Sequence, residues 1–138
     1  MALILDTGPL LAALDAADGD HEACAELVIS SREDLVVPML VLSELDYWCA
    51  QRLPPEVWDG FLEDLIAGAY RAEAPTAADF VRCREFQAGY ADLALGIVDA
   101  SVIALTERFG EEKVATLDHR HFSVVRPAHT EALTLLPS

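Results

Sequence analysis

Three carboxylates stand at points from which a fold could bring them together. Asp6 ends the apolar run "ALILD" and Asp118 ends "KVATLD", and both runs are typical of buried strands. Asp99 stands at the front of the apolar segment 96–110, whose spacing is helical. Ligands of open parallel sheets bind beyond the carboxyl ends of the strands. We therefore expect Asp6, Asp99 and Asp118 to meet at one edge of a sheet.

Glu44 is the fourth candidate, on a helix predicted over residues 39–51. Its helical neighbours are all apolar, which predicts that it lies on the core-facing side: Leu40, Val41, Tyr47 and Trp48. A carboxylate in that position needs a partner. A structural arginine is the ordinary choice, but the chain has only nine basic residues and none among the first 31. A cation from solution is therefore the interpretation that we prefer.

Carboxylates gathered without a counter-charge repel one another, so that some would be forced to protonate. A divalent cation relieves this repulsion, and oxygen ligands suit Mg²⁺ or Mn²⁺. Such a centre can activate water and stabilise negative charge on a phosphodiester. A second interpretation stays open for Asp99, because an aspartate at the front of a helix is also a good cap for the backbone amides.

The elements that must position these side chains alternate along the chain. Strands are predicted over 2–6, 34–38, 69–74, 113–118 and, at an edge, 132–136. Helices are predicted over 7–16, 21–30, 39–51, 55–68, 77–89 and 96–110. This alternation indicates an α/β fold with a mainly parallel sheet. No linker divides the chain, so we expect residues 1–138 to form a single domain.

Acidic residues dominate the composition. The formal net charge is −15, and residues 1–31 hold six acids without one lysine or arginine. A field of this sign repels nucleic acid, so any nucleic-acid chemistry needs metal ions or a few local arginines. The acidity equally suits a basic protein partner, or serves solubility alone.

The cysteines and the apolar runs bear on location. Cys24, Cys49 and Cys83 form no CxxC pair, which argues against a disulfide framework and fits the reduced cytosol. The longest apolar runs are too short to span a bilayer. We expect a cytoplasmic protein that has no contact with membranes.

The segments that carry the carboxylates resemble those of the PIN-domain ribonucleases, and in particular of the VapC-type toxins of type II toxin–antitoxin pairs. They are "LDTGPLLA" (5–12), "VPMLVLSEL" (37–45), "ADLALGIVDASVIALTERFG" (91–110) and "VATLDHRHF" (114–122). The resemblance implies a three-layer α/β/α sandwich around a parallel sheet. It also implies an endoribonuclease that depends on Mg²⁺ or Mn²⁺ and leaves a 5′-phosphate and a free 3′-hydroxyl.

The resemblance assigns roles to the four acids. A metal ion is then held by Asp6, Glu44 and Asp99, and Asp118 completes the acidic catalytic site.

Five further residues have supporting roles in this interpretation. Thr7 or Thr116 would orient a carboxylate or a water molecule, and we expect Thr116 and Asp118 to share one face of a strand. Asp92 is either a member of the site or a solvated loop acid. Arg120 and His121 would contact RNA, although a surface position is also open for His121.

The resemblance further implies partners. A cognate basic antitoxin would pack against the helices and push a basic residue toward the acidic site, and the protein would form a homodimer. The apolar stripe of the helix 55–68 either lines the antitoxin groove or packs into the core: Val57, Trp58, Phe61, Leu62 and Leu65. The alternative function is a catalytically inert PIN-like module that only binds or regulates a partner, and metal titration distinguishes the two.

Overall fold

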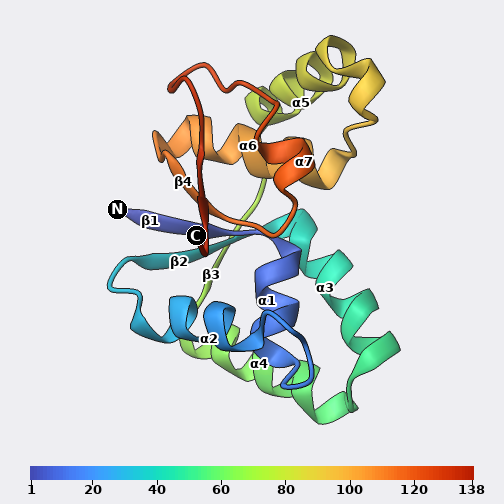
Figure 1. The fold of residues 1–138 in the computed structure, drawn as a ribbon, viewed down its shortest axis with the longest axis vertical. Helices are drawn as coiled ribbons and strands as arrows, with labels where there is room; N and C mark the ends of the chain where they lie inside the picture. The colour runs from blue at the N-terminus through green and yellow to red at the C-terminus, as the bar shows by residue number, and fades with distance from the viewer.

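Five strands form one sheet in which every neighbouring pair is parallel, in the order β3–β2–β1–β4–β5. The computed structural model describes residues 1–138, and its strands cross the middle of the molecule (Figure 1). The strands are β1 (Ala2–Leu5), β2 (Asp34–Pro38), β3 (Arg71–Glu73), β4 (Lys113–Ala115) and β5 (Thr134–Leu136). This arrangement confirms the predicted α/β fold, with 132–136 contributing the edge strand.

Helices cover both faces of the sheet. Helices α1 to α4 lie on one side, and α5, α6 and α7 lie on the other (Figure 1). Their bounds are α1 (Thr7–Leu14), α2 (His21–Ser30), α3 (Met39–Arg52), α4 (Pro55–Ala67), α5 (Ala77–Gly89), α6 (Ile97–Phe109) and α7 (His119–Phe122), with a 3₁₀ turn η1 (Ala91–Leu93) before α6. The three-layer sandwich is therefore confirmed. None of these helices combines the length and the apolarity that crossing a membrane requires.

The sheet and α6 form the centre of the core. All four residues of β1 are buried, as expected for a central parallel strand covered on both faces. Every residue of α6 from Ala100 to Thr106 is buried as well, because this helix is enclosed by its neighbours. The front ends of α1 and α6 consequently have fixed positions beside the end of β1.

The three cysteines are free thiols inside the helical layers. Cys24 lies in α2, Cys49 in α3 and Cys83 in α5, and none is more than 1% exposed. Burial raises the pKa of each thiol above its ordinary value. They pack as small apolar side chains.

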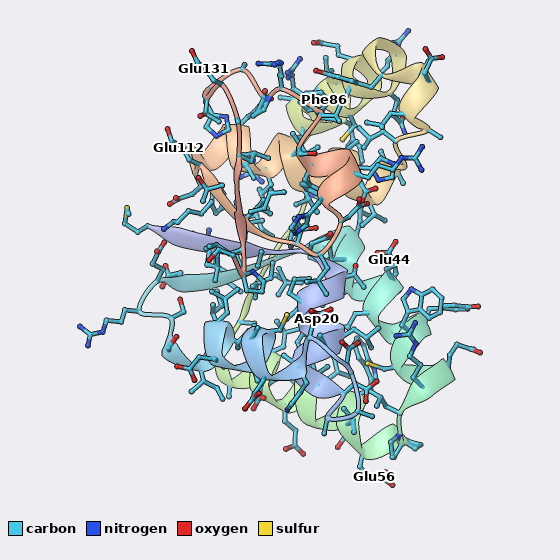
Figure 2. The ribbon with its side chains drawn as sticks, in the orientation of Figure 1. Asp20, Glu44, Glu56, Phe86, Glu112 and Glu131 are labelled. Atoms are coloured by element: carbon cyan, nitrogen blue, oxygen red, sulfur yellow. The ribbon has the colours of Figure 1, made fainter.

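Acidic side chains project from both helical layers. Asp20 and Glu56 stand on the side of α1 to α4, and Glu112 and Glu131 on the opposite side (Figure 2). All four are exposed, which spreads the net charge of −15 over the surface.

The chain beyond β4 differs from the prediction. The strand ends at Ala115, and Asp118 lies after it, as the cap of the short helix α7. The expectation that Thr116 and Asp118 share one face of a strand is wrong. The two residues still meet, because the amide of Asp118 donates a hydrogen bond to the hydroxyl of Thr116 at 3.0 Å.

Candidate active site

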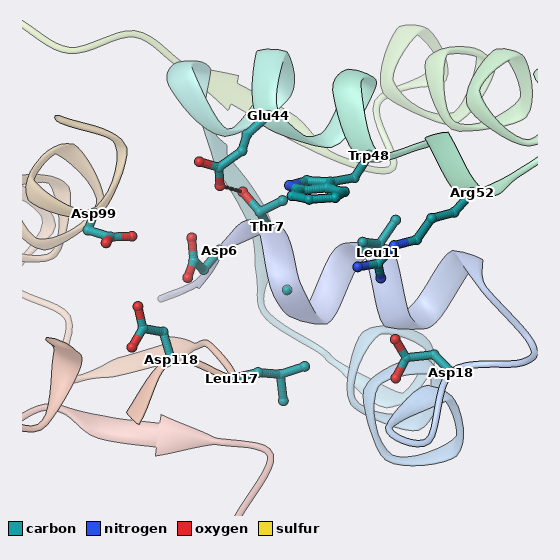
Figure 3. A pocket seen from close by; sticks show the side chains of 11 residues that line it. Asp6, Thr7, Leu11, Asp18, Glu44, Trp48, Arg52, Asp99, Leu117 and Asp118 are labelled. Atoms are coloured by element: carbon teal, nitrogen blue, oxygen red, sulfur yellow. Dashed lines mark hydrogen bonds between the residues drawn. The ribbon is translucent and has the colours of Figure 1, made fainter. Parts of the chain in front are cut away.

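A cleft of about 490 Å³ opens at the carboxyl ends of β1 and β4. The four predicted carboxylates all line it, and Figure 3 shows Asp6, Asp99 and Asp118 turned toward one another with Glu44 above them. Its remaining walls are Thr7, Gly8, Leu11, Asp18, Trp48, Arg52 and Leu117. The parallel topology thus brings together acids that are far apart in sequence.

Asp6 is the most enclosed of the acids, because it follows the buried strand β1 directly. Its side chain is 5% exposed, and one carboxylate oxygen, Oδ2, accepts a hydrogen bond from the Thr116 hydroxyl at 2.8 Å. The other oxygen, Oδ1, is buried without any partner. Burial raises the pKa of Asp6 to about 6. A buried oxygen without a donor is costly, and a bound cation would supply what it lacks.

Asp99 is the third residue of α6, and Gly96 holds the cap position in front of the helix. Asp99 therefore does not cap its own helix, and that interpretation is wrong. The nearest cationic atom is Nδ1 of His121, at 3.8 Å from a carboxylate oxygen. Burial, and then the negative charges of Asp6 and Asp118, raise the pKa of Asp99 to about 7.

Asp118 is paired with His121 from the same short helix. One carboxylate oxygen accepts a hydrogen bond from the His121 backbone amide at 3.1 Å, and the other lies 2.6 Å from Nδ1 of the ring. The second ring nitrogen lies 3.1 Å from the carbonyl oxygen of Leu93. Both ring nitrogens face acceptors, so an imidazolium satisfies the geometry, and the bond to Asp118 raises the pKa of His121. His121 thus belongs to the acidic site and is not a surface residue.

Glu44 faces the cleft and not the core. The buried stripe of α3 consists of Val41, Leu45 and Cys49, whereas Trp48 is 37% exposed. The core-facing position predicted for Glu44 is therefore wrong. Its carboxylate accepts a hydrogen bond of 2.5 Å from the hydroxyl of Thr7, which opens α1 (Figure 3). Thr7 and Thr116 each hold one carboxylate of the cleft.

Four predicted residues do not line the cleft: Thr116 and His121 bond its carboxylates, whereas Asp92 and Arg120 make no bond to them. Asp92 is exposed on η1 and lines a separate hollow with Tyr90 and Val124. Arg120 is exposed on α7 and does not line the cleft.

Trp48 and Arg52, by contrast, line the cleft and were not predicted to do so. Both follow Glu44 at steps of four residues on α3, and this spacing is the signal from which they could have been found.

The donor set fits a hard divalent cation. Potential ligand atoms of Asp99, Asp118 and His121 all lie within 4.8 Å of one another, and the two carboxylates are the donors left for an ion because both His121 ring nitrogens face acceptors. The unpartnered Oδ1 of Asp6 adds a further oxygen at the same cleft. Carboxylates predominate, which favours ions such as Mg²⁺ over zinc.

Comparisons with known proteins agree with this geometry. Residues 3–126 match the PIN domain family. The chain is 37% identical to Ribonuclease VapC26 of Mycobacterium tuberculosis over 135 residues. The aligned region covers 98% of this chain and 100% of that protein.

Solved structures share the fold at lower identity. VapC20 of Mycobacterium tuberculosis, described as a sarcin-ricin loop cleaving toxin, superposes with a TM-score of 0.74 at 20% identity, over 81% of this chain and 86% of that one. VapBC2 of Rickettsia felis, bound to a DNA fragment from its promoter, gives a TM-score of 0.70 at 15% identity over 98% of both chains. With its fold, its acidic cleft and these similarities together, the chain belongs to the PIN-domain family and is a homologue of VapC26.

Proposed function

We propose that the protein is an endoribonuclease that hydrolyses RNA phosphodiester bonds with Mg²⁺ or Mn²⁺, as the toxin of a type II toxin–antitoxin system. The observation that carries this proposal is the buried, unpartnered Oδ1 of Asp6 in a cleft that Glu44, Asp99 and Asp118 also line. The similarity to Ribonuclease VapC26 supports ribonuclease chemistry in particular.

In this proposal Asp6, Glu44 and Asp99 hold the cation, and Asp118 completes the site. A bound Mg²⁺ or Mn²⁺ would activate a water molecule and offset the charge of the phosphodiester oxygens. The two threonines described above restrict the rotation of Asp6 and Glu44, so those oxygens are in place before an ion arrives.

His121 fixes Asp118 in the same way. Its ring lies within hydrogen-bond distance of Asp118 on one side and of the Leu93 carbonyl on the other. This arrangement holds the Asp118 carboxylate at the rim of the cleft in a single orientation. When protonated, the form that its raised pKa favours, the ring also places one positive charge among acids that would otherwise repel the substrate.

The antitoxin and the homodimer belong to the same proposal. An acidic cleft on a chain of net charge −15 suits a basic segment, and the fold similarity to VapBC2 supports a partner of that kind. Trp58 stacks on the buried Phe61 at 5.5 Å between ring centroids, so part of the α4 stripe serves the core. The half-buried members of the stripe are available to line the antitoxin groove: Val57, Leu62 and Leu65. Light scattering with and without the co-encoded basic protein tests both assemblies.

Metal dependence tests the enzymatic part. We expect the purified protein to cleave a single-stranded oligoribonucleotide with Mg²⁺ or Mn²⁺, to stop in excess EDTA, and to resume when metal is restored. Calorimetric titration with Mn²⁺ distinguishes the inert module, which has no reason to bind the ion. Cleavage that continues undiminished in EDTA would refute the metal mechanism.

A further inference from the structure

Three side chains follow one another along the face of α3 that borders the cleft. Glu44, Trp48 and Arg52 are spaced by four residues, and all three line the cleft (Figure 3). At a rise of about 1.5 Å per residue, each step advances about 6 Å along the helix. A carboxylate, an indole and a guanidinium thus lie in a row that leads away from the acidic site.

Trp48 is the only aromatic side chain that lines the cleft. It is 37% exposed, so part of its ring is not used in core packing. The guanidinium carbon of Arg52 lies 4.9 Å from the centre of its ring. A planar aromatic surface is therefore presented to the cleft, next to a cation.

Arg52 is the only cationic side chain that lines the cleft, and it is exposed. It forms no ion pair, and the other arginines without one, Arg32, Arg84, Arg120 and Arg126, do not line the cleft. Asp18 lies across the cleft from it (Figure 3) but is not bonded to it. The guanidinium is therefore free to take an anion, and its planar fork suits a phosphate group.

We propose that Trp48 and Arg52 bind the RNA strand beside the scissile bond, with a base stacked on Trp48 and a backbone phosphate on Arg52. This inference rests on the proposed function, since it extends the same site. Two steps of about 6 Å accommodate neighbouring nucleotides, because a stacked strand advances about 3.4 Å per nucleotide and a splayed strand advances further. Stacking accepts every base, so this subsite contributes affinity and placement and does not read sequence.

The charge at the Arg52 end of the row favours RNA as its occupant, whereas the acidic end suits a basic protein segment. The expected antitoxin is basic, and a basic segment would be repelled by the guanidinium of Arg52, whereas a phosphate is attracted. The acids at the other end of the row repel phosphate unless a cation is bound there. RNA should therefore occupy the whole row only in the metal-loaded protein.

Steady-state cleavage of a fluorescein-labelled 12-nucleotide RNA, with Mn²⁺ present, tests this subsite. We expect Trp48→Ala to raise KM about tenfold with kcat changed less than threefold, and Trp48→Phe to restore most of the loss because a ring remains. Arg52→Ala should raise KM and make the dependence of log KM on log salt concentration shallower by about 0.7. Phe80→Ala and Arg32→Ala remove an exposed aromatic and an exposed arginine outside the cleft, and should change neither parameter.

Fluorescence supplies a readout that does not depend on cleavage. Trp58→Phe keeps a ring stacked on Phe61 and leaves Trp48 as the only tryptophan. With Mg²⁺ present, we expect the RNA to quench Trp48 emission saturably, and Arg52→Ala to weaken this binding. If Trp48→Ala cleaves the RNA with an unchanged KM, the inference is overturned, but the proposed nuclease activity is not.

The remaining outcomes are equally decisive. Quenching of Trp48 without any cleavage supports the subsite and refutes the nuclease. Neither quenching nor cleavage refutes both. If Trp48→Ala weakens the binding of the co-encoded basic protein but not of the RNA, the row binds the antitoxin and the inference is refuted.

Discussion

Replacing Asp99 by asparagine separates a metal ligand from a structural acid. The pKa of Asp99 rises from 3.8 to about 7 because the carboxylate is buried beside Asp6 and Asp118. Each pKa unit corresponds to about 1.36 kcal/mol. Above pH 7 the ionised side chain therefore lowers the free energy of unfolding of the metal-free protein by roughly 4 kcal/mol. Asparagine removes this cost but leaves an amide without a partner, at about 1–3 kcal/mol.

The net expectation is a variant that is more stable than the wild type without metal. We expect a gain on the order of 1–2 kcal/mol at pH 8 in EDTA, or about 3 °C in Tm for each kcal/mol. Between about pH 4 and pH 7 the native Asp99 keeps a proton that the unfolded chain has released, so wild-type stability falls as pH rises through this window. The advantage of Asp99→Asn should therefore shrink toward pH 4.5.

The assay combines thermal denaturation at pH 4.5 and pH 8 with RNA cleavage, and Asp59→Asn on the exposed face of α4 serves as a charge-matched control. Added Mg²⁺ should raise the Tm of the wild type more than that of Asp99→Asn, because the ion binds only the intact site tightly. Cleavage by the variant should collapse. A variant that melts below the wild type in EDTA at pH 8, or that cleaves RNA at the wild-type rate, would refute the reasoning.

Three further outcomes follow from the same geometry. Thr116→Val removes the hydroxyl that serves both Asp6 and the amide of Asp118, so Mn²⁺ affinity measured by calorimetry should fall about tenfold. Asp92→Asn should leave Mn²⁺ affinity unchanged, since this acid lines a different hollow. A tenfold loss of affinity would show that Asp92 belongs to the metal site. In the wild type, Mn²⁺ affinity should rise about 100-fold from pH 5.5 to 7.5, with release of protons. Asp6 and Asp99 have pKa values of about 6 and about 7, so both are largely protonated at pH 5.5 and must lose these protons to bind the ion. An affinity that does not change with pH contradicts this.

The meeting of the four carboxylates was predictable because it depends on topology. Buried apolar runs marked β1 and β4, and parallel strands end at a common edge, so Asp6 and Asp118 had to be neighbours. Regular helices such as α2 and α5 were predicted with their bounds, since apolar spacing and flanking turn residues determine both. These features follow from local pattern and from a general rule of sheet geometry.

The details that failed depend on packing. Apolar residues surround α3 on nearly every side, so periodicity could not select Val41, Leu45 and Cys49 as its buried stripe; contact with α1, α4 and α6 selects them. Helix α7 is one turn long, and it depends on the bond from the His121 amide to Asp118. Such a short element has too few residues to show a period.

The three buried cysteines give the protein a built-in measure of local opening. A thiol reagent can reach Cys24, Cys49 or Cys83 only when its helix detaches, because each is at most 1% exposed. Labelling rates at the three positions would therefore report separately on α2 and α3 in one layer and on α5 in the other. Mass spectrometry of thiol labelling on the wild-type chain could then show which helical layer opens first in denaturant. It could also show in which layer metal or RNA slows the labelling.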